Sequence, residues 1–132
     1  MSAIFFDRYF EGNPLTSTNF ESGDEAIARL QGELNRVPHF VELQSDKNTK
    51  LLIGLGGEMG CAQFSSIAGD PPYLMACLPG HESLEGFEYF YISGELSEVP
   101  KQYCIPLGAL LKVIKDFVDT GTQSHTVNWV EI

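Results

Sequence analysis

Residues 106–121, PLGALLKVIKDFVDTG, form the most regular stretch of the sequence. Its apolar residues recur at helical spacing, at Leu107, Leu110, Leu111, Ile114, Phe117 and Val118. Pro106 stands at the first helical position and Gly121 just past the last one, an asymmetry typical of helix ends. The stretch predicts an amphipathic helix with one apolar stripe, which must cover a sheet or another helix.

A second helix is predicted over residues 22–37. Ser22 is a candidate N-cap, and Glu25 three residues later completes a capping box. Apolar residues follow at helical spacing up to Val37, and Pro38 is expected to end the helix. Before this helix, residues 3–6 predict a short strand or apolar anchor, and residues 11–20 predict a loop.

The hydrophobic period changes from about 3.6 to 2 after Pro38. The strand candidates are HFVELQ (39–44), TKLLIGL (49–55), CAQFSSI (61–67), PYLMACL (72–78), EYFYISGEL (88–96) and the closing TVNWVEI (126–132). Short strands joined by short turns indicate an antiparallel meander. We therefore expect one α+β domain over residues 1–132, with a single antiparallel, meander-like β-sheet and two α-helices packed on one face.

Four glycines lie within residues 54–60, GLGGEMG. A dinucleotide fingerprint would need a glycine where Met59 stands, followed by a helix, and a phosphate loop would need a G-K-[ST] ending. The residues that follow alternate like a strand instead. Residues 56–58 are therefore predicted to form a hairpin turn, where glycine supplies positive φ.

The chain has 132 residues, with 8 basic and 18 acidic side chains and a net charge of −10. This charge opposes direct binding of nucleic acid and would attract a basic protein partner, although acidity can also serve solubility alone. The sequence shows no apolar run long enough to span a membrane and no signal-peptide pattern, so residence in the cytoplasm is expected. Cys61, Cys77 and Cys104 are scattered within apolar runs, as expected for reduced, structural cysteines.

No strong catalytic motif is present. The three histidines are His39, His81 and His125, and none has metal-ligand spacing. His81 next to Glu82 is the most suggestive pair, since a carboxylate beside an imidazole could support general-base chemistry in a small hydrolase. The zinc-deaminase pattern is absent. We expect no cofactor, no metal and no enzymatic activity.

The last third of the chain carries a family resemblance. An aromatic strand ends at Gly94 and Glu95, the segment CIPLGALLKVIKDFVDTG follows, and a terminal strand contains Trp129 and Glu131. Together with the helix EAIARLQGELNR and the hairpin LLIGLGGEMGCAQF, residues 22–132 resemble a family of bacterial immunity proteins. These proteins neutralise polymorphic toxins, often toxins of the deaminase superfamily. The resemblance implies that the four motif residues, Gly94, Glu95, Trp129 and Glu131, are structural.

The resemblance also implies an antitoxin-like binder of a basic cognate toxin, itself a monomer or dimer when free. Function tends to reside on loops, and aromatic anchors often dominate binding energy. The candidate partner-binding residues are Glu58, Asp70, Tyr73, His81, Glu82, Glu85 and Glu88, with Tyr89 and Tyr91 as further aromatic candidates. An acidic adaptor with some other protein partner is the alternative function.

Overall fold

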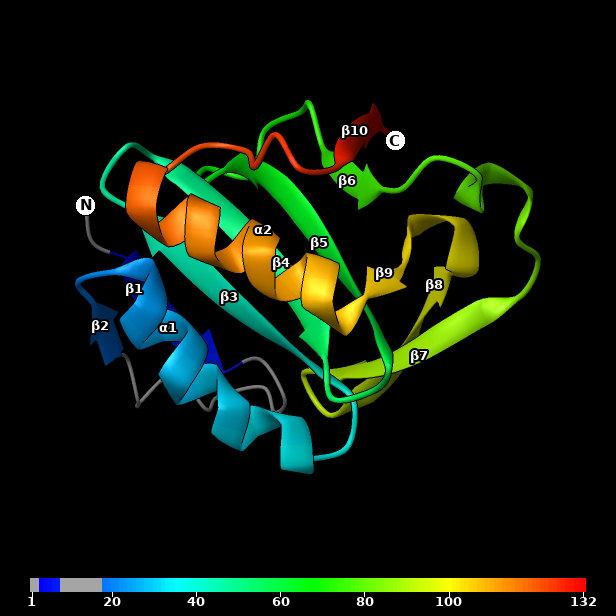
Figure 1. Cartoon of the computed structure of the whole chain (residues 1–132), viewed down its shortest axis with the longest axis horizontal. Coiled ribbons are helices and arrows are strands. Elements are labelled where there is room, and N and C mark those ends of the chain that lie inside the picture. Colours follow the sequence, from blue (N-terminus) through cyan, green and yellow to red (C-terminus); the bar gives the residue numbers. More distant parts are fainter. Residues whose placement is uncertain (1–2, 8–17) are drawn as a thin grey trace.

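The computed structural model describes residues 3–7 and 18–132, which form one sheet with two α-helices on one face (Figure 1). The strands are β1 (Ala3–Asp7), β2 (Thr18–Phe20), β3 (His39–Ser45), β4 (Thr49–Leu55), β5 (Met59–Ser66), β6 (Leu74–Cys77), β7 (Phe87–Ile92), β8 (Glu95–Pro100), β9 (Ile105–Pro106) and β10 (Asn128–Glu131). The helices are α1 (Gly23–Leu30) and α2 (Leu107–Thr120), with short 3₁₀ helices η1 (Gln31–Asn35), η2 (His81–Ser83) and η3 (Lys101–Tyr103).

The sheet confirms the predicted α+β class. Its strand order is β10-β6-β5-β4-β3-β1-β2, and every pairing along this path is antiparallel. The antiparallel hairpin of β7 and β8 joins the sheet through one parallel bridge, between Tyr91 and His39. This hairpin extends past the N-terminal end of α2, outside the area that the helices cover (Figure 1).

The first helix begins as predicted but ends early. Ser22 Oγ accepts a hydrogen bond from the backbone N–H of Glu25 at 3.2 Å, while the Glu25 carboxylate accepts from the N–H of Glu21. The α-helix stops at Leu30 and continues as η1, so the prediction of helix up to Val37 is wrong, and Val37 is 49 % exposed. The change coincides with Gly32, a poor α-helix former.

The predicted loop over residues 11–20 is corrected at its end. Residues 18–20 form β2, because Phe20 is fully buried and packs on Phe5 with ring centroids 5.8 Å apart. Residues 11–17 lie outside the described part of the chain.

The second helix starts one residue later than predicted, since Pro106 is its N-cap and Leu107 its first residue. Gly121 adopts φ of 73° and donates its N–H to the carbonyl of Phe117 at 2.7 Å, which ends the helix. The buried stripe is Leu110, Val113, Ile114, Phe117 and Val118. Val113 was therefore missed by the predicted stripe, while Leu107 and Leu111 are only partly buried.

The glycine-rich stretch forms the predicted hairpin turn between β4 and β5. Gly56 has φ of 118°, and a Cβ there would lie 2.8 Å from Pro38 Cα. A Cβ on Gly54 would lie 2.9 Å from Cδ1 of Phe90, and one on Gly60 would lie 2.5 Å from Cδ2 of Leu110. The missing side chains of these glycines therefore let Pro38, Phe90 and Leu110 pack directly against the backbone of β4, β5 and the turn between them.

The predicted single strand over residues 88–96 is wrong, because it is a hairpin. Ser93 and Gly94 both have positive φ, 52° and 80°, and this two-residue turn reverses the chain between β7 and β8. Under the hairpin, on the sheet face opposite the helices, lies a second apolar cluster, composed of Phe40, Cys61, Met75, Phe90, Val99 and Cys104. The larger core lies between the helices and the sheet.

Candidate partner-binding surface

The predicted partner-binding residues do not form one site. Glu58 precedes β5 and Asp70 follows it, so they lie at opposite ends of an eight-residue strand. At about 3.3 Å per residue, that strand is about 25 Å long. His81, Glu82, Glu85 and Glu88, in contrast, lie in and after η2 and lead directly into β7. The structure thus brings four of the seven candidates together at the base of the hairpin.

The segment around η2 lies next to the two cysteines Cys77 and Cys104 and is held by a contact to the backbone. His81 Nδ1 lies 3.1 Å from the carbonyl oxygen of Cys104, so this nitrogen is the donor and carries the proton. Burial, followed by the nearby Glu88 carboxylate, raises the pKa of the Cys104 thiol to about 12. Burial and then Glu82 likewise raise the pKa of Cys77. Both thiols are therefore protonated near neutral pH and are poor nucleophiles.

The remaining predicted residues have local contacts that order loops. The Tyr73 hydroxyl donates to the carbonyl of Gly69, and the carbonyl of Tyr73 accepts from the N–H of Ile132 at 3.0 Å. The N–H of Asp70 donates to Ser66 Oγ, and its side chain is exposed. The side chain of Glu58 is exposed as well, while its carbonyl accepts from the N–H of Leu107 at the start of α2.

One face of the β7–β8 hairpin carries exposed apolar side chains that sequence reasoning largely missed. Phe87 and Tyr89 alternate along β7, and Tyr89 lies opposite Glu98 in the pairing with β8. Phe87 is 45 % exposed, Tyr89 50 % and Leu96 56 %. We call these four residues, Phe87, Tyr89, Leu96 and Glu98, the outer hairpin face. The alternation of residues 87, 89 and 91 against the buried Phe90 was the signal in the sequence that could have revealed it.

Charge is distributed unevenly over the chain. Residues 51–100 contain seven carboxylates and no lysine or arginine: Glu58, Asp70, Glu82, Glu85, Glu88, Glu95 and Glu98. Among residues 3–7 and 18–132, no ion pair within 4.0 Å involves any of the seven. The carboxylates of this region are therefore not held in ion pairs by other described residues.

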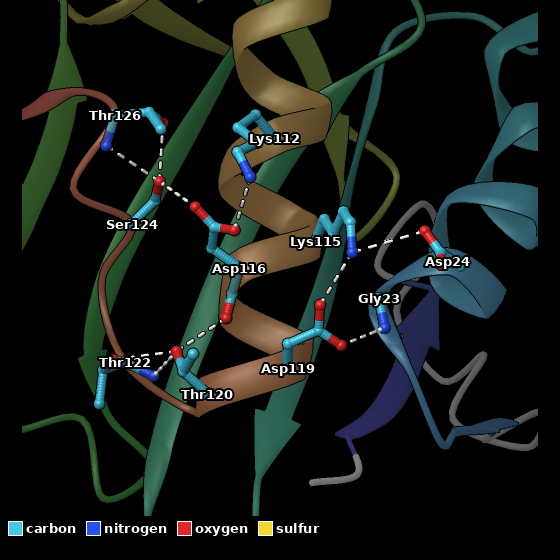
Figure 2. Close-up of polar contacts among 10 residues, drawn as sticks. All are labelled: Gly23, Asp24, Lys112, Lys115, Asp116, Asp119, Thr120, Thr122, Ser124 and Thr126. Carbon is cyan, nitrogen blue, oxygen red and sulfur yellow. Dashed lines mark hydrogen bonds and ion pairs between the residues drawn. The ribbon is translucent and has the colours of Figure 1, made fainter.

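The charges of helix α2 are paired, as Figure 2 shows. Lys115 Nζ lies 3.0 Å from Asp119 and 3.5 Å from Asp24, and Lys112 Nζ lies 3.2 Å from Asp116. Asp119 also accepts the backbone N–H of Gly23 at 2.7 Å. That hydrogen bond, and then the one from Lys115, lower the pKa of the Asp119 carboxyl. These contacts join α2 to the start of α1.

A buried ionic cluster follows α1. Glu33 is 6 % exposed and accepts from Arg36 at 2.7 Å and from Arg29 at 3.1 Å. His39, fully buried, places Nε2 at 3.3 Å from Glu33 and Nδ1 at 2.8 Å from the carbonyl of Val37. The hydrogen bond with His39, and then those from the two arginines, lower the pKa of Glu33 to about 2. The cluster anchors η1 to the start of β3.

The four motif residues lie in turns and at the sheet edge. Gly94 completes the β7–β8 turn, and the exposed Glu95 opens β8. Trp129 Nε1 donates to the carbonyl of Ser124 at 2.8 Å, and its ring packs on Phe64 with centroids 6.1 Å apart. Glu131 is exposed at the end of β10, which pairs with β6. The contacts of Gly94 and Trp129 fit a structural role.

Within the described residues, no group of three or more His, Cys, Asp or Glu side chains could hold a metal ion. None of the described helices is long and apolar enough to cross a membrane. On the outer hairpin face, the carboxylate of Glu98 lies opposite the exposed ring of Tyr89, an arrangement suited to binding a protein.

Comparison with known protein families agrees with this picture. The family model described as immunity protein Imm1 matches residues 11–131. No curated protein matches the chain significantly. The match covers the helices, the sheet strands from β2 onward and the hairpin. The chain belongs to the Imm1 family of immunity proteins.

Proposed function

We propose that this immunity protein binds a toxin that acts on nucleic acid, a deaminase-superfamily toxin, and neutralises it through the acidic surface around η2 and the β7–β8 hairpin, within residues 51–100. The observation that carries the proposal is the set of seven carboxylates in this span, without a single lysine or arginine. A toxin that handles a polyanionic substrate needs a basic cleft. Carboxylates can replace phosphates there, because they form charge-assisted hydrogen bonds with arginine and lysine.

The position of these carboxylates supports the proposal further. On the helix layer, the cations of α2 hold neighbouring carboxylates in ion pairs (Figure 2). At the hairpin, Glu85, Glu95 and Glu98 are exposed and form no ion pair with any described residue. A negative surface of this kind attracts a basic partner over a distance and speeds the encounter. Rapid capture protects the cell that makes the toxin.

The proposed action is binding without catalysis. His81 uses Nδ1 to hold the carbonyl of Cys104, and within the described residues no hydrogen bond joins it to Glu82. The adjacent thiols of Cys77 and Cys104 have raised pKa values, so neither provides a ready thiolate. These contacts disfavour the hydrolase alternative. Because the target of the toxin lies inside the producing cell, we place the action of the protein in the cytoplasm.

The test is a direct neutralisation assay. The product of the neighbouring toxin gene is purified with and without this chain, and the deamination of cytosine or adenine in nucleic acid is measured. We expect a stable complex and loss of toxin activity at equimolar concentration. Undiminished toxin activity at a saturating concentration of this chain would refute neutralisation. A neutralised toxin that hydrolyses nucleic acid without deaminating it would refute the deaminase assignment alone.

A further inference from the structure

A groove of about 430 Å³ lies between the second face of the sheet and the β7–β8 hairpin. Its floor includes Phe40, Leu52 and Met75, and its wall on the hairpin includes Ile92, Ser97 and Val99. The volume falls within the range of about 300–1,000 Å³ that is typical of ligand pockets. The groove is thus large enough for one or two bulky apolar side chains.

The groove exists because the hairpin is attached to the sheet at one place. Tyr91 pairs with His39, and this is the single bridge between β7 and β3. Phe90 fills the base, where Gly54 has no Cβ to obstruct its ring. Across from Phe90 in the hairpin stands Ser97, whose small side chain leaves the space above it open. The lining of the groove also includes Ile132, which is 56 % exposed.

The charged residue that lines the groove is acidic. Among the described residues that line it, Glu98 is the only one with a charged side chain, and it stands at the edge where the groove meets the outer hairpin face. Glu95 lies on the same hairpin face as Ser97, two residues away along β8, and is exposed. Neither carboxylate has an ion-pair partner among the described residues. A segment that enters the groove therefore meets an apolar floor and two carboxylates of β8 on the side of the hairpin.

We propose that the groove receives a large apolar side chain of the toxin, presented on a segment with an adjacent arginine or lysine that pairs with Glu98 or Glu95. This inference rests on the proposed function and names the contact that anchors the complex. Apolar anchors in desolvated pockets, surrounded by polar contacts, carry most of the energy in protein interfaces. The two carboxylates of β8 select a basic segment as the occupant, in agreement with the charge of the span 51–100.

The proposal is tested by a substitution that fills the groove with a large side chain of this chain. Ser97→Trp places an indole in the open space opposite Phe90, and Thr122→Trp adds the same side chain at an exposed position beyond α2. Affinity for the purified toxin is measured by calorimetry, after circular dichroism shows that both variants are folded. We expect Ser97→Trp to weaken binding at least 100-fold and Thr122→Trp to change it less than threefold.

A second groove variant keeps the proposal testable if Ser97→Trp does not fold. Ile132→Lys adds a positive charge at the exposed mouth of the groove, where it removes no buried contact, and should weaken binding of the basic segment at least tenfold. Wild-type affinity in both groove variants would overturn this inference and leave the proposed function intact. Failure of the wild-type chain to bind the toxin would overturn the proposed function and the inference together. A free dimer that Ser97→Trp dissociates would assign the groove to a second copy and likewise refute the inference.

Discussion

The helix layer and the β7–β8 hairpin differ in how far their apolar side chains are buried and in whether their carboxylates form ion pairs. On the helix layer, apolar residues such as Phe117 are buried, and the cations of α2 pair with carboxylates of both helices. On the hairpin, Tyr89 and Leu96 are about half exposed, and Glu98 lies beside them without an ion pair among the described residues. One region satisfies its side chains internally, and the other leaves them available to a partner.

The difference indicates that one region serves stability and the other serves binding. Exposed apolar patches and unpaired like charges are costly or neutral for folding, so their concentration in one region points to binding. The helix layer and the main core supply stability. Mutations should therefore separate the two properties: changes on the helix layer should lower stability, and changes on the hairpin should lower toxin affinity.

The largest effect is expected in the main core. Phe117→Ala removes a fully buried ring of α2 that packs edge-on against Phe64. Loss of buried apolar area plus the cavity should lower the free energy of unfolding by about 3–5 kcal/mol. Urea denaturation would measure it. Wild-type toxin affinity in the folded variant would support the separation of stability from binding. A loss of unfolding free energy below 1 kcal/mol would contradict it.

Glu33→Gln should have the next largest effect. It removes a buried carboxylate from His39, Arg29 and Arg36, which should cost about 2 kcal/mol. The folded state holds the pKa of Glu33 at about 2, below the ordinary 4.5, so the unfolded chain binds more protons between these values. The stabilisation is therefore fully present above pH 4.5 and is lost as the pH falls towards 2.

The measurement for Glu33 is urea denaturation of wild type and Glu33→Gln from pH 7 down to pH 2. The difference between their free energies of unfolding should be constant above about pH 5.5 and shrink as the carboxyl is protonated. A difference that stays unchanged down to pH 2.5 would show that this carboxylate is not the linked group.

Tyr89→Ala tests the hairpin side of the comparison. Exposed aromatic anchors typically cost about 2 kcal/mol of binding when truncated, which is roughly a 30-fold loss of affinity. Because Tyr89 is half exposed, its loss should change stability by less than about 0.5 kcal/mol. Val37→Ala, at an equally exposed apolar position after η1, is the matched control and should bind normally. Equal affinity losses in the two variants would contradict a specific role of the hairpin.

Asp119→Asn should have the smallest effect. It weakens the ion pair with Lys115 at a partly exposed site while one side-chain oxygen remains to accept from the N–H of Gly23. The expected loss of stability is about 0.5–1 kcal/mol, and it should decrease in 1 M salt because salt screens the pair. Thermal unfolding at low and high salt measures both. A loss above 2 kcal/mol would show that this contact does more than join the two helices.

Local patterns predicted most of the fold. Helix α2 and the turn at residues 56–58 follow from apolar period and glycine position, which the sequence displays directly. The turn at Ser93 was not predictable in the same way, because serine rarely adopts positive φ and the long-range fit of the hairpin imposes it. The early end of α1 was missed because the apolar spacing continues to Leu34 and Val37, although Gly32 lies where the α-helix gives way to η1.

The candidate surface could be predicted by its charge but not by its apolar side chains. The net negative charge and the loop position of the acidic residues are visible in the sequence and led to Glu82, Glu85 and Glu88. Phe87 and Leu96 look like core residues in a strand, and only the folded hairpin shows which face is exposed. The groove needs three separate segments to meet, so it is a property of the tertiary structure alone.

The central claim is that the partner binds at the hairpin and not at the helix side. The most direct test removes the same number of negative charges from each region in turn. One variant combines Glu85→Gln, Glu95→Gln and Glu98→Gln, and the other combines Glu21→Gln, Glu25→Gln and Asp46→Asn, so both lose three negative charges at exposed positions. Toxin affinity and association rate are measured for both at low salt. We expect at least a 100-fold loss of affinity and a slower association for the hairpin variant, and less than a threefold change for the other. Equal effects, or a larger effect on the helix side, would contradict the account.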